Sequence, residues 1–308
     1  MLFKIVQDIS PVFLVIALGF FARRRGLLPD AFTESANRLV YNIGIPLLIF
    51  SQVAPGDFSR NFRPGQIAAL LCAIVVTAAL GLLLATLLRL PPPTTLTFVQ
   101  VCYHGNTGFI ALAVLLYALG PAGLAAGSVL AGFTMLINNT LSLALFTFSP
   151  HHRRRLSRAS LRSFLGNPII LATMLGLVLS ALRVPLPSVL LRSIGFVSDM
   201  ALPVALLIIG GSLSPAMRSR LPLAHLVSVL KLAMLPALGV VFLRLVGAEA
   251  AATLPAVILL GSPAATLSYV MAREMNGDAE LAAATVTVST VLSMVSYTVW
   301  IAALSRPG

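Results

Sequence analysis

The chain has 308 residues, of which 58% are hydrophobic and 10% are charged. Its mean hydropathy is +0.98, and a soluble domain carries about 25% charged residues, so the composition excludes a soluble domain and predicts an integral membrane protein. The net charge of +12 comes mainly from arginines in short loops between apolar runs. This distribution favours a role in topology and contact with anionic lipid headgroups over nucleic-acid binding.

Ten apolar segments are candidates for membrane-spanning helices, since about 20 apolar residues cross a bilayer. In the first half they lie near residues 5–22, 35–53, 66–88, 95–119 and 121–148. In the second half they lie near residues 164–182, 189–213, 221–243, 250–271 and 279–304. Between them, residues 149–162 form a basic loop with five arginines. The sequence therefore predicts an all-helical polytopic protein with two five-helix halves, 1–148 and 163–308.

The fourth and ninth spans are both interrupted. Gly105, Asn106, Thr107 and Gly108 break the fourth, and the run GSPAA at 261–265 breaks the ninth. Irregular backbone at membrane depth survives only where it lines a cavity or is buried in protein, and glycine and proline disrupt a helix for known steric reasons. We therefore expect each span to consist of two half-helices that meet at a site. Ordinary helix kinks are the alternative.

The two halves match at a single offset. Pro46 and Pro203 are 157 positions apart, and the same offset relates three further pairs: Pro11 and Pro168, Gly19 and Gly176, Gly120 and Gly277. It also relates the two breaks, because Asn106 corresponds to Pro263. Five spans are an odd number, so the second half enters the membrane from the opposite side. The pattern predicts an inverted repeat in which the broken fourth and ninth helices cross, as in many secondary transporters.

Basic residues gather on one side when the spans are threaded alternately. That side holds thirteen, namely Arg23, Arg24, Arg25, Arg38, Arg89, the five arginines of the loop, Arg218, Arg220 and Arg273. The other side holds seven, namely Lys4, Arg60, Arg63, Arg183, Arg192, Arg244 and Arg306. The positive-inside rule then predicts a cytoplasmic basic loop and both termini outside.

The two breaks form the candidate binding site. Half-helix N-termini offer free N–H groups that suit a carboxylate, and the preceding C-terminal ends offer carbonyls that suit a cation. Neither broken span holds an acidic residue in its apolar stretch, which favours an organic or an anionic solute over cation/proton exchange. The candidate substrate-binding residues are Gly105, Asn106, Thr107, Gly108, Ser262, Pro263 and Thr266.

Three ionisable residues in spans are further candidates for coupling or charge pairing. Lys231 and Asp199 lie near the middle of the eighth and seventh spans, so they either neutralise one another or act directly in transport. His104 adjoins the first break and either relays protons or is a bonded core residue. We predict no catalytic residue, metal site or cofactor, since the chain has two isolated cysteines and no P-loop, HExxH or GxSxG motif.

Four stretches resemble the auxin efflux carrier family, in its short bacterial branch of malate, malonate and related transporters. They are NIGIPLLIF at 42–50, GNTGF at 105–109, DMALPVALLIIGGSL at 199–213, and the segment at 262–293 that begins SPAATLSYV. The resemblance implies a fold related to the bile acid/sodium symporters, with spans 1, 2, 6 and 7 as a scaffold, spans 3–5 and 8–10 as a moving transport domain, and substrate at the crossing. Ala111 and Ala113 replace a Gly and a Pro common in relatives, so the relatives' substrate preference does not transfer.

These observations together predict a secondary carrier of small organic anions, in particular carboxylates, that works by elevator-like alternating access. A sodium-coupled symporter of bile acid or sterol-like solutes is the first alternative, and a membrane sensor without transport is a lower one. A membrane-embedded enzyme lacks support. The coupling ion, proton or sodium, the direction of transport and the oligomeric state stay open, with a homodimer as one arrangement.

Overall fold

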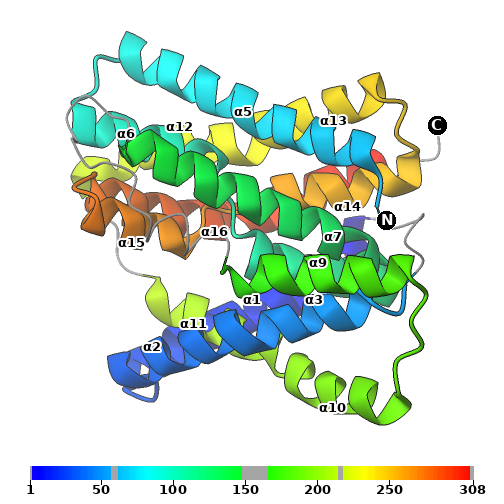
Figure 1. The fold of residues 1–308 in the computed structure, drawn as a ribbon. Coiled ribbons are helices and arrows are strands. Elements are labelled where there is room, and N and C mark those ends of the chain that lie inside the picture. Colours follow the sequence, from blue (N-terminus) through cyan, green and yellow to red (C-terminus); the bar gives the residue numbers. More distant parts are fainter. Residues whose placement is uncertain (1, 57–61, 148–165, 214–217, 306–308) are drawn as a thin grey trace.

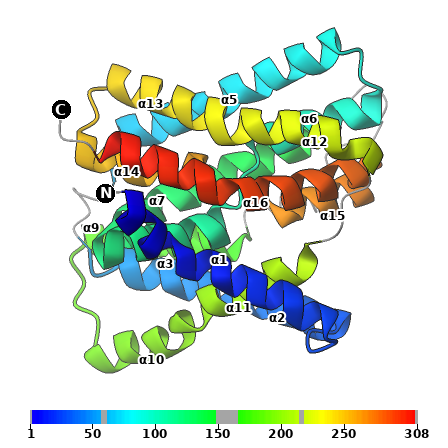
Figure 2. The same cartoon turned by 180° about the vertical axis from the view of Figure 1, so that it is seen from behind.

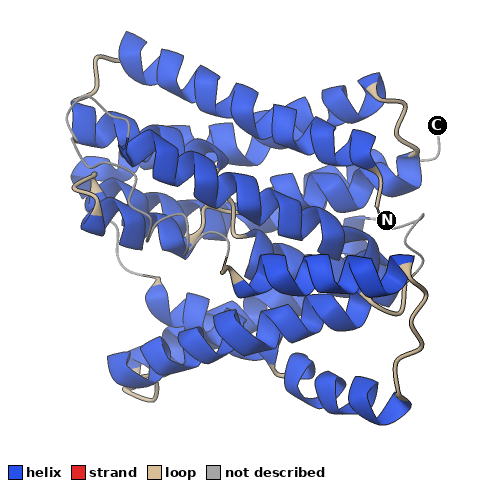
Figure 3. Ribbon diagram, viewed as in Figure 1, coloured by secondary structure: helices blue, strands red, loops and turns tan. Residues whose placement is uncertain are grey.

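The computed structural model describes residues 2–56, 62–147, 166–213 and 218–305. Within these ranges the chain is helical, and Figure 3 shows helices joined by loops without a strand. In the described ranges, six helical segments are long and apolar enough to span a membrane: Leu2–Arg24, Pro64–Leu87, Thr107–Thr147, Ser188–Ser212, Leu221–Leu245 and Ala279–Leu304. The predicted all-helical membrane fold is confirmed at this level. The basic loop at 149–162 lies outside the described residues.

In the first half, the elements are α1 (Leu2–Arg24), α2 (Asp30–Leu39), the π-helical turn η1 (Val40–Gly44), α3 (Ile45–Val53), α5 (Pro64–Leu87), α6 (Pro92–Tyr103), the π-helical turn η2 (Thr107–Ala111) and α7 (Leu112–Thr147). Within α7, Gly120 has φ 69° and ψ −169°, a backbone conformation that glycine adopts without strain. Pro121 follows it, so α7 consists of two helices joined at a sharp bend.

In the second half, the elements are α9 (Pro168–Ala181), α10 (Ser188–Asp199), α11 (Ala201–Ser212), the short turn η3 (Arg218–Arg220), α12 (Leu221–Val229), the π-helical turn η4 (Leu230–Met234), α13 (Leu235–Leu245), α14 (Ala250–Leu260), α15 (Thr266–Glu274) and α16 (Ala279–Leu304). The predicted seventh span is bent at Met200, where α10 ends. Pro203 explains this bend, because its ring crowds the carbonyl of Asp199 four residues earlier.

The helices form two groups. Figures 1 and 2 show α1, α2, α3, α10 and α11 in one layer, α5, α6 and α12–α16 in another, and α7 and α9 between them. Helix α1 packs along α11, and α9 packs along α3. Helix α1 begins and α16 ends at the same end of the molecule in both views, while the turn between α1 and α2 lies at the opposite end.

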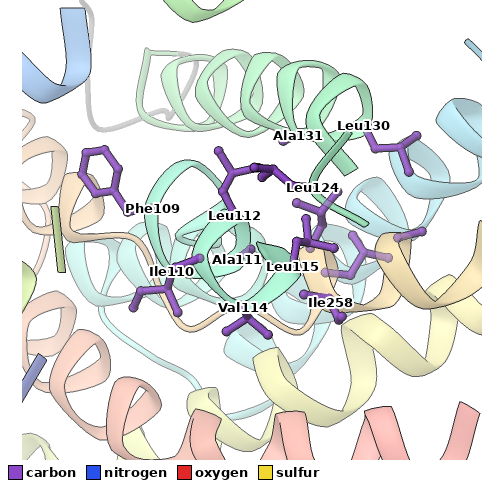
Figure 4. Close-up of a cluster of buried hydrophobic side chains, with 14 of the residues drawn as sticks. Phe109, Ile110, Ala111, Leu112, Val114, Leu115, Leu124, Leu130, Ala131 and Ile258 are labelled. Atoms are coloured by element: carbon purple, nitrogen blue, oxygen red, sulfur yellow. The ribbon is translucent and has the colours of Figure 1, made fainter. Parts of the chain in front are cut away.

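The core is densest around the helix that follows the first break. The residues from Phe109 to Leu115 are all buried and pack against apolar side chains of the second part of α7 and of α14, such as Leu124 and Ile258 (Figure 4). Ala111 and Ala113 are fully buried here. A helix that is apolar on every side can be stable only when protein or lipid surrounds it completely, so this segment is fixed at the centre of the larger group.

A polar cluster at Asp278 joins three elements at the end of the molecule away from α1's first residue. One carboxylate oxygen caps α16 by accepting from the Leu281 N–H at 2.9 Å. The other accepts from the Thr94 hydroxyl at 2.9 Å and lies 3.0 Å from an Arg220 nitrogen. The Asp278 N–H donates to the Thr97 hydroxyl at 2.8 Å. Asp278 thereby ties α6 and the start of α12 to the start of α16.

Replacing this carboxylate should destabilise the fold. Asp278→Ala removes a helix cap and two bonds to a charged group, and we expect a loss of about 2–4 kcal/mol. Glu280→Gln is the control, because Glu280 is exposed and lies 3.7 Å from Arg220, where an ion pair is worth little. Thermal unfolding in detergent measures both; equal melting temperatures for the two variants would contradict this role of Asp278.

Candidate functional site

Both predicted helix breaks are present. Helix α6 ends at Tyr103, and η2 begins at Thr107. Helix α14 ends at Leu260, and α15 begins at Thr266. Asn106 precedes η2 and caps it, since its side-chain oxygen accepts from the Ile110 N–H. The prediction that these two spans are each divided into two helices is confirmed.

The two breaks pair with each other as a short antiparallel bridge between Gly105 and Ala264. The Asn106 N–H donates to the Pro263 carbonyl at 2.7 Å, and the Ala265 N–H donates to the His104 carbonyl at 3.0 Å. The Ala264 N–H donates to the Ser289 hydroxyl on α16 at 3.0 Å. Each break therefore supplies the hydrogen-bond partners that the other lacks, which is what irregular backbone needs inside a membrane protein.

At position 105 the crossing has no room for a residue larger than glycine. A Cβ atom there would lie 2.2 Å from the Ser262 hydroxyl oxygen and 3.0 Å from the Lys231 ammonium nitrogen. Gly108 is less restricted, since a Cβ atom there would meet the flexible end of Met135 at 3.0 Å. The first glycine of the GNTGF motif is thus required by the close approach of the two chain segments.

A cavity of about 1180 Å³ lies beside the crossing, between the two helix groups. One wall comes from α2, η1, α11 and the start of α9, and the other from η2, α15 and the second part of α7. The candidate residues that border it are His104, Gly105, Asn106, Thr107, Gly108 and Thr266. Further polar side chains come from residues that the sequence analysis did not name as site candidates: Asn37, Tyr41, Asn42, Asn139, Asn167 and Tyr269.

Ser262 and Pro263 do not border this cavity, although the sequence predicted them beside the substrate. The Ser262 hydroxyl donates to the Leu259 carbonyl at 2.8 Å, and the side chain is fully buried. Pro263 contributes only its carbonyl, which accepts from Asn106. Both residues therefore support the crossing on the side away from the cavity and do not line the cavity.

Tyr41 and Asn167 form a polar contact across the cavity wall. The Asn167 amide donates to the Tyr41 hydroxyl at 3.0 Å, and its side-chain oxygen caps α9 at Ile169. The family motif at 42–50 begins one residue after Tyr41, and Asn167 precedes Pro168, which is a common helix-start signal. Both signals were in the sequence, but neither indicated that the two residues meet.

His104 is held by a short chain of hydroxyl groups. Its Nδ1 lies 3.0 Å from the Ser142 hydroxyl, which lies 3.0 Å from the Tyr103 hydroxyl. The rings of Tyr103 and His104 are parallel within 4°. His104 is buried yet borders the cavity, so it joins the site to α7.

Lys231 and Asp199 do not pair with one another, so the first of the two alternatives offered for them is wrong. Lys231 is fully buried, and its ammonium donates to the Leu260 carbonyl at 2.7 Å. Asp199 is exposed at the end of α10, in the other helix group. Because Pro203 bends the seventh span, Asp199 lies at the end of α10 and not in α11, the helix that packs near the core. Asp199 therefore does not line the cavity.

The mouth of the cavity is charged. Asp30 and Glu34 border it from α2 and pair with Arg23 and Arg38 respectively. Among the described residues that line the cavity, Arg38 is the only arginine or lysine. The cavity therefore runs from an ion-paired entrance to an uncharged polar floor at the crossing.

Comparison with known proteins agrees with this architecture. The model of the family described as "Membrane transport protein" matches residues 4–149 and 136–301. An "Uncharacterized transporter" of Methanothermobacter thermautotrophicus is 26% identical over 96% of both chains. A "Putative malonate transporter" of Rhizobium meliloti is 25% identical over 96% of this chain and 94% of its own. The chain therefore belongs to the membrane transport protein family, to which the auxin efflux carriers belong, and is a transporter and not an enzyme.

Proposed function

We propose that this protein is a secondary carrier of small organic anions, with carboxylates as the substrate class, and that the solute binds where the two breaks cross. The observation that carries the proposal is the antiparallel pairing of Gly105 with Ala264 beside a cavity that Asn106 and Thr107 also line. Two helices, η2–α7 and α15, begin beside that cavity. The first N–H groups of a helix lack intrahelical acceptors and carry partial positive charge, which suits a carboxylate.

Ten membrane crossings in an inverted five-plus-five repeat are part of this proposal. A shift of 157 residues carries α5 onto 221–244, α6 onto 249–260 and the second part of α7 onto 278–304, and the bounds of α12–α13, α14 and α16 agree within a few residues. The contact of α1 with α11 becomes the contact of α9 with α3 under the same shift. Such an exchange is what a twofold axis between the repeats requires, and it supports the inverted repeat.

We propose transport by an elevator-like movement of one helix group along the other. The layer of α1, α2, α3, α10 and α11, together with α9, is the proposed scaffold, and the remaining helices form the proposed transport domain that carries the crossing. Support comes from the position of the cavity, which has walls from both groups. A movement of one group along the other would then carry the floor of the cavity across the membrane.

The proposed orientation has both termini in the periplasm of a bacterial inner membrane and the basic loop in the cytoplasm. Support comes from α1 and α16, whose terminal ends lie at the same end of the molecule. The cavity mouth at Asp30, Glu34 and Arg38 lies near the turn after Arg24, on the side where the arginines gather. This location supports an inward-open state as part of the proposal.

Substitutions at the floor of the cavity test the substrate site. Asn106→Ala and Thr107→Val should lower the initial uptake of transported carboxylates by about tenfold or more, because each removes a polar group from a buried site. Thr86→Val is the matched control, since the exposed Thr86 hydroxyl bonds within its own helix to Leu82. The assay is uptake of radiolabelled malonate and malate by proteoliposomes. Wild-type uptake by both cavity variants would remove the crossing as the binding site.

A sodium-coupled carrier of larger amphipathic acids is the second candidate. The cavity volume of about 1180 Å³ favours it, since sites for drug-sized ligands occupy about 300–1,000 Å³. For a small dicarboxylate, the same space would be a water-filled entrance. Radiolabelled cholate, assayed beside malonate with and without a sodium gradient, separates the two candidates.

A further inference from the structure

Lys231 is the one buried lysine or arginine in the part of the chain that the structure describes. It lies in η4, behind the crossing, and does not border the cavity. Its ammonium donates to the carbonyl of Leu260, the last residue of α14, at 2.7 Å. No acidic side chain of the described residues forms an ion pair with it. Lys231 does not line the proposed solute site, so the presence of a buried positive charge at this position needs another explanation.

The same ammonium lies against the first break. A Cβ atom on Gly105 would be 3.0 Å from the Lys231 nitrogen and 3.2 Å from its Cε. Lys231 therefore lies against the C-terminal end of α14 on one side and against Gly105, two residues beyond α6, on the other. It is in contact with both segments of the crossing at once.

The two chain segments at the crossing place partial negative charge next to each other, which a nearby positive charge would stabilise. The C-terminal end of a helix carries partial negative charge from carbonyls without intrahelical donors. Both α6 and α14 end at the crossing. In carriers built from broken helices, such carbonyls coordinate a cation. Here the Lys231 nitrogen lies within hydrogen-bonding distance of one such carbonyl, that of Leu260.

Hydrogen bonds to the backbone next to Lys231 keep its helix turn in place behind the crossing. Pro236 has no N–H, so the carbonyl of Leu232, four residues earlier, loses its helical donor. The Ser296 hydroxyl and the Trp300 indole N–H of α16 each donate to that carbonyl at 2.9 Å. The helix widens to a π-turn over Leu230–Met234. These contacts fix the π-turn that carries Lys231 to α16, within the same helix group as the crossing.

We propose that the Lys231 ammonium is the built-in counter-cation of the crossing and takes the place of a coupling sodium ion, so that carboxylate binding on the cavity side requires no sodium. Lys231 is a positioning residue, because it holds α14 against Gly105 and does not touch the solute. The inference rests on the proposed function.

Solute counterflow in proteoliposomes tests the inference. The liposomes are loaded with unlabelled malonate, malate or cholate, and uptake of the same labelled acid is followed in sodium chloride and in choline chloride. The wild type should give equal rates in both salts. Lys231→Gln should lower the rate by about tenfold or more, as expected for the loss of a charged hydrogen bond. Lys231→Arg should restore uptake in both salts, because it keeps the charge.

Lys4→Gln is the matched control, since Lys4 is the other lysine of the chain and lies at its start. Cooperative thermal unfolding in detergent verifies that each variant is folded. If Lys231→Gln does not fold, the salt comparison on the wild type and on Lys231→Arg still decides the question.

The outcomes separate the inference from the proposed function. Wild-type counterflow that requires sodium, or unchanged counterflow in a folded Lys231→Gln, would overturn the role of Lys231 and leave the carrier function standing. Absence of counterflow by the wild type for every acid in both salts would overturn the proposed function, and the inference with it. Equal rates in both salts, lost in Lys231→Gln and restored in Lys231→Arg, support both.

Discussion

Gly105→Ala should abolish carboxylate uptake while the protein still reaches the membrane. The added Cβ atom would lie 2.2 Å from the Ser262 oxygen and 3.0 Å from the Lys231 nitrogen. Neither side chain can move away easily, because the Ser262 hydroxyl is hydrogen-bonded to the Leu259 carbonyl and the Lys231 ammonium to the Leu260 carbonyl. The two breaks would have to separate, and the bonds from Asn106 to Pro263 and from Ala265 to His104 would be lost. We expect uptake to fall by about a hundredfold, the equivalent of about 2.7 kcal/mol.

Gly65→Ala is the control for this substitution. A Cβ atom at Gly65 meets Val246 at 3.7 Å, an ordinary contact, so uptake and stability should match the wild type. Counterflow rates normalised to the amount of reconstituted protein measure both variants. Uptake by Gly105→Ala within twofold of the wild type would mean that the crossing tolerates separation and that its close packing has no functional role.

Gly210→Ala should destabilise the packing of α11 on α1 more than any other glycine substitution in that contact. A Cβ atom at Gly210 would lie 1.9 Å from the Ile16 backbone oxygen, and one at Gly19 would lie 2.2 Å from the Leu207 backbone oxygen. Backbone atoms cannot rotate away, so the helices must move apart. Alanine is favoured over glycine within a helix by about 1 kcal/mol, yet we expect a net loss of about 1–3 kcal/mol from overpacking.

Gly195→Ala provides the comparison for this loss of stability. It also lies within a helix, α10, but a Cβ atom there meets nothing within 4 Å, so only the gain in helix propensity applies. Thermal unfolding in detergent should give a lower melting temperature for Gly210→Ala and an unchanged or higher one for Gly195→Ala. Equal melting temperatures would show that α1 and α11 do not pack as closely as described.

The sequence was sufficient to locate the two breaks. Their residues carry a local physical signal, because Pro263 lacks an N–H and Gly105 lacks a side chain. The offset of 157 then related Asn106 to Pro263, and these two residues share a hydrogen bond of 2.7 Å. Local chemistry and a repeat together thus predicted a long-range contact.

Other parts of the site depend on geometry that no local pattern encodes. Asp199 and Lys231 both seemed central when spans were treated as straight helices, but Pro203 ends α10 near Asp199 and directs it away from the core. Ser262 lies in the second break and Thr266 is the first residue after it, yet only Thr266 borders the cavity. The meeting of Tyr41 with Asn167 joins α9 to η1, and no residue spacing indicates it.

Counterflow of labelled malonate and malate through the wild type and Asn106→Ala tests the central claim most directly, because it requires no knowledge of the coupling ion. The account predicts saturable counterflow of at least one carboxylate by the wild type and a loss of about tenfold or more in Asn106→Ala. Equal counterflow by the two proteins, or none above protein-free liposomes for any carboxylate, would contradict it.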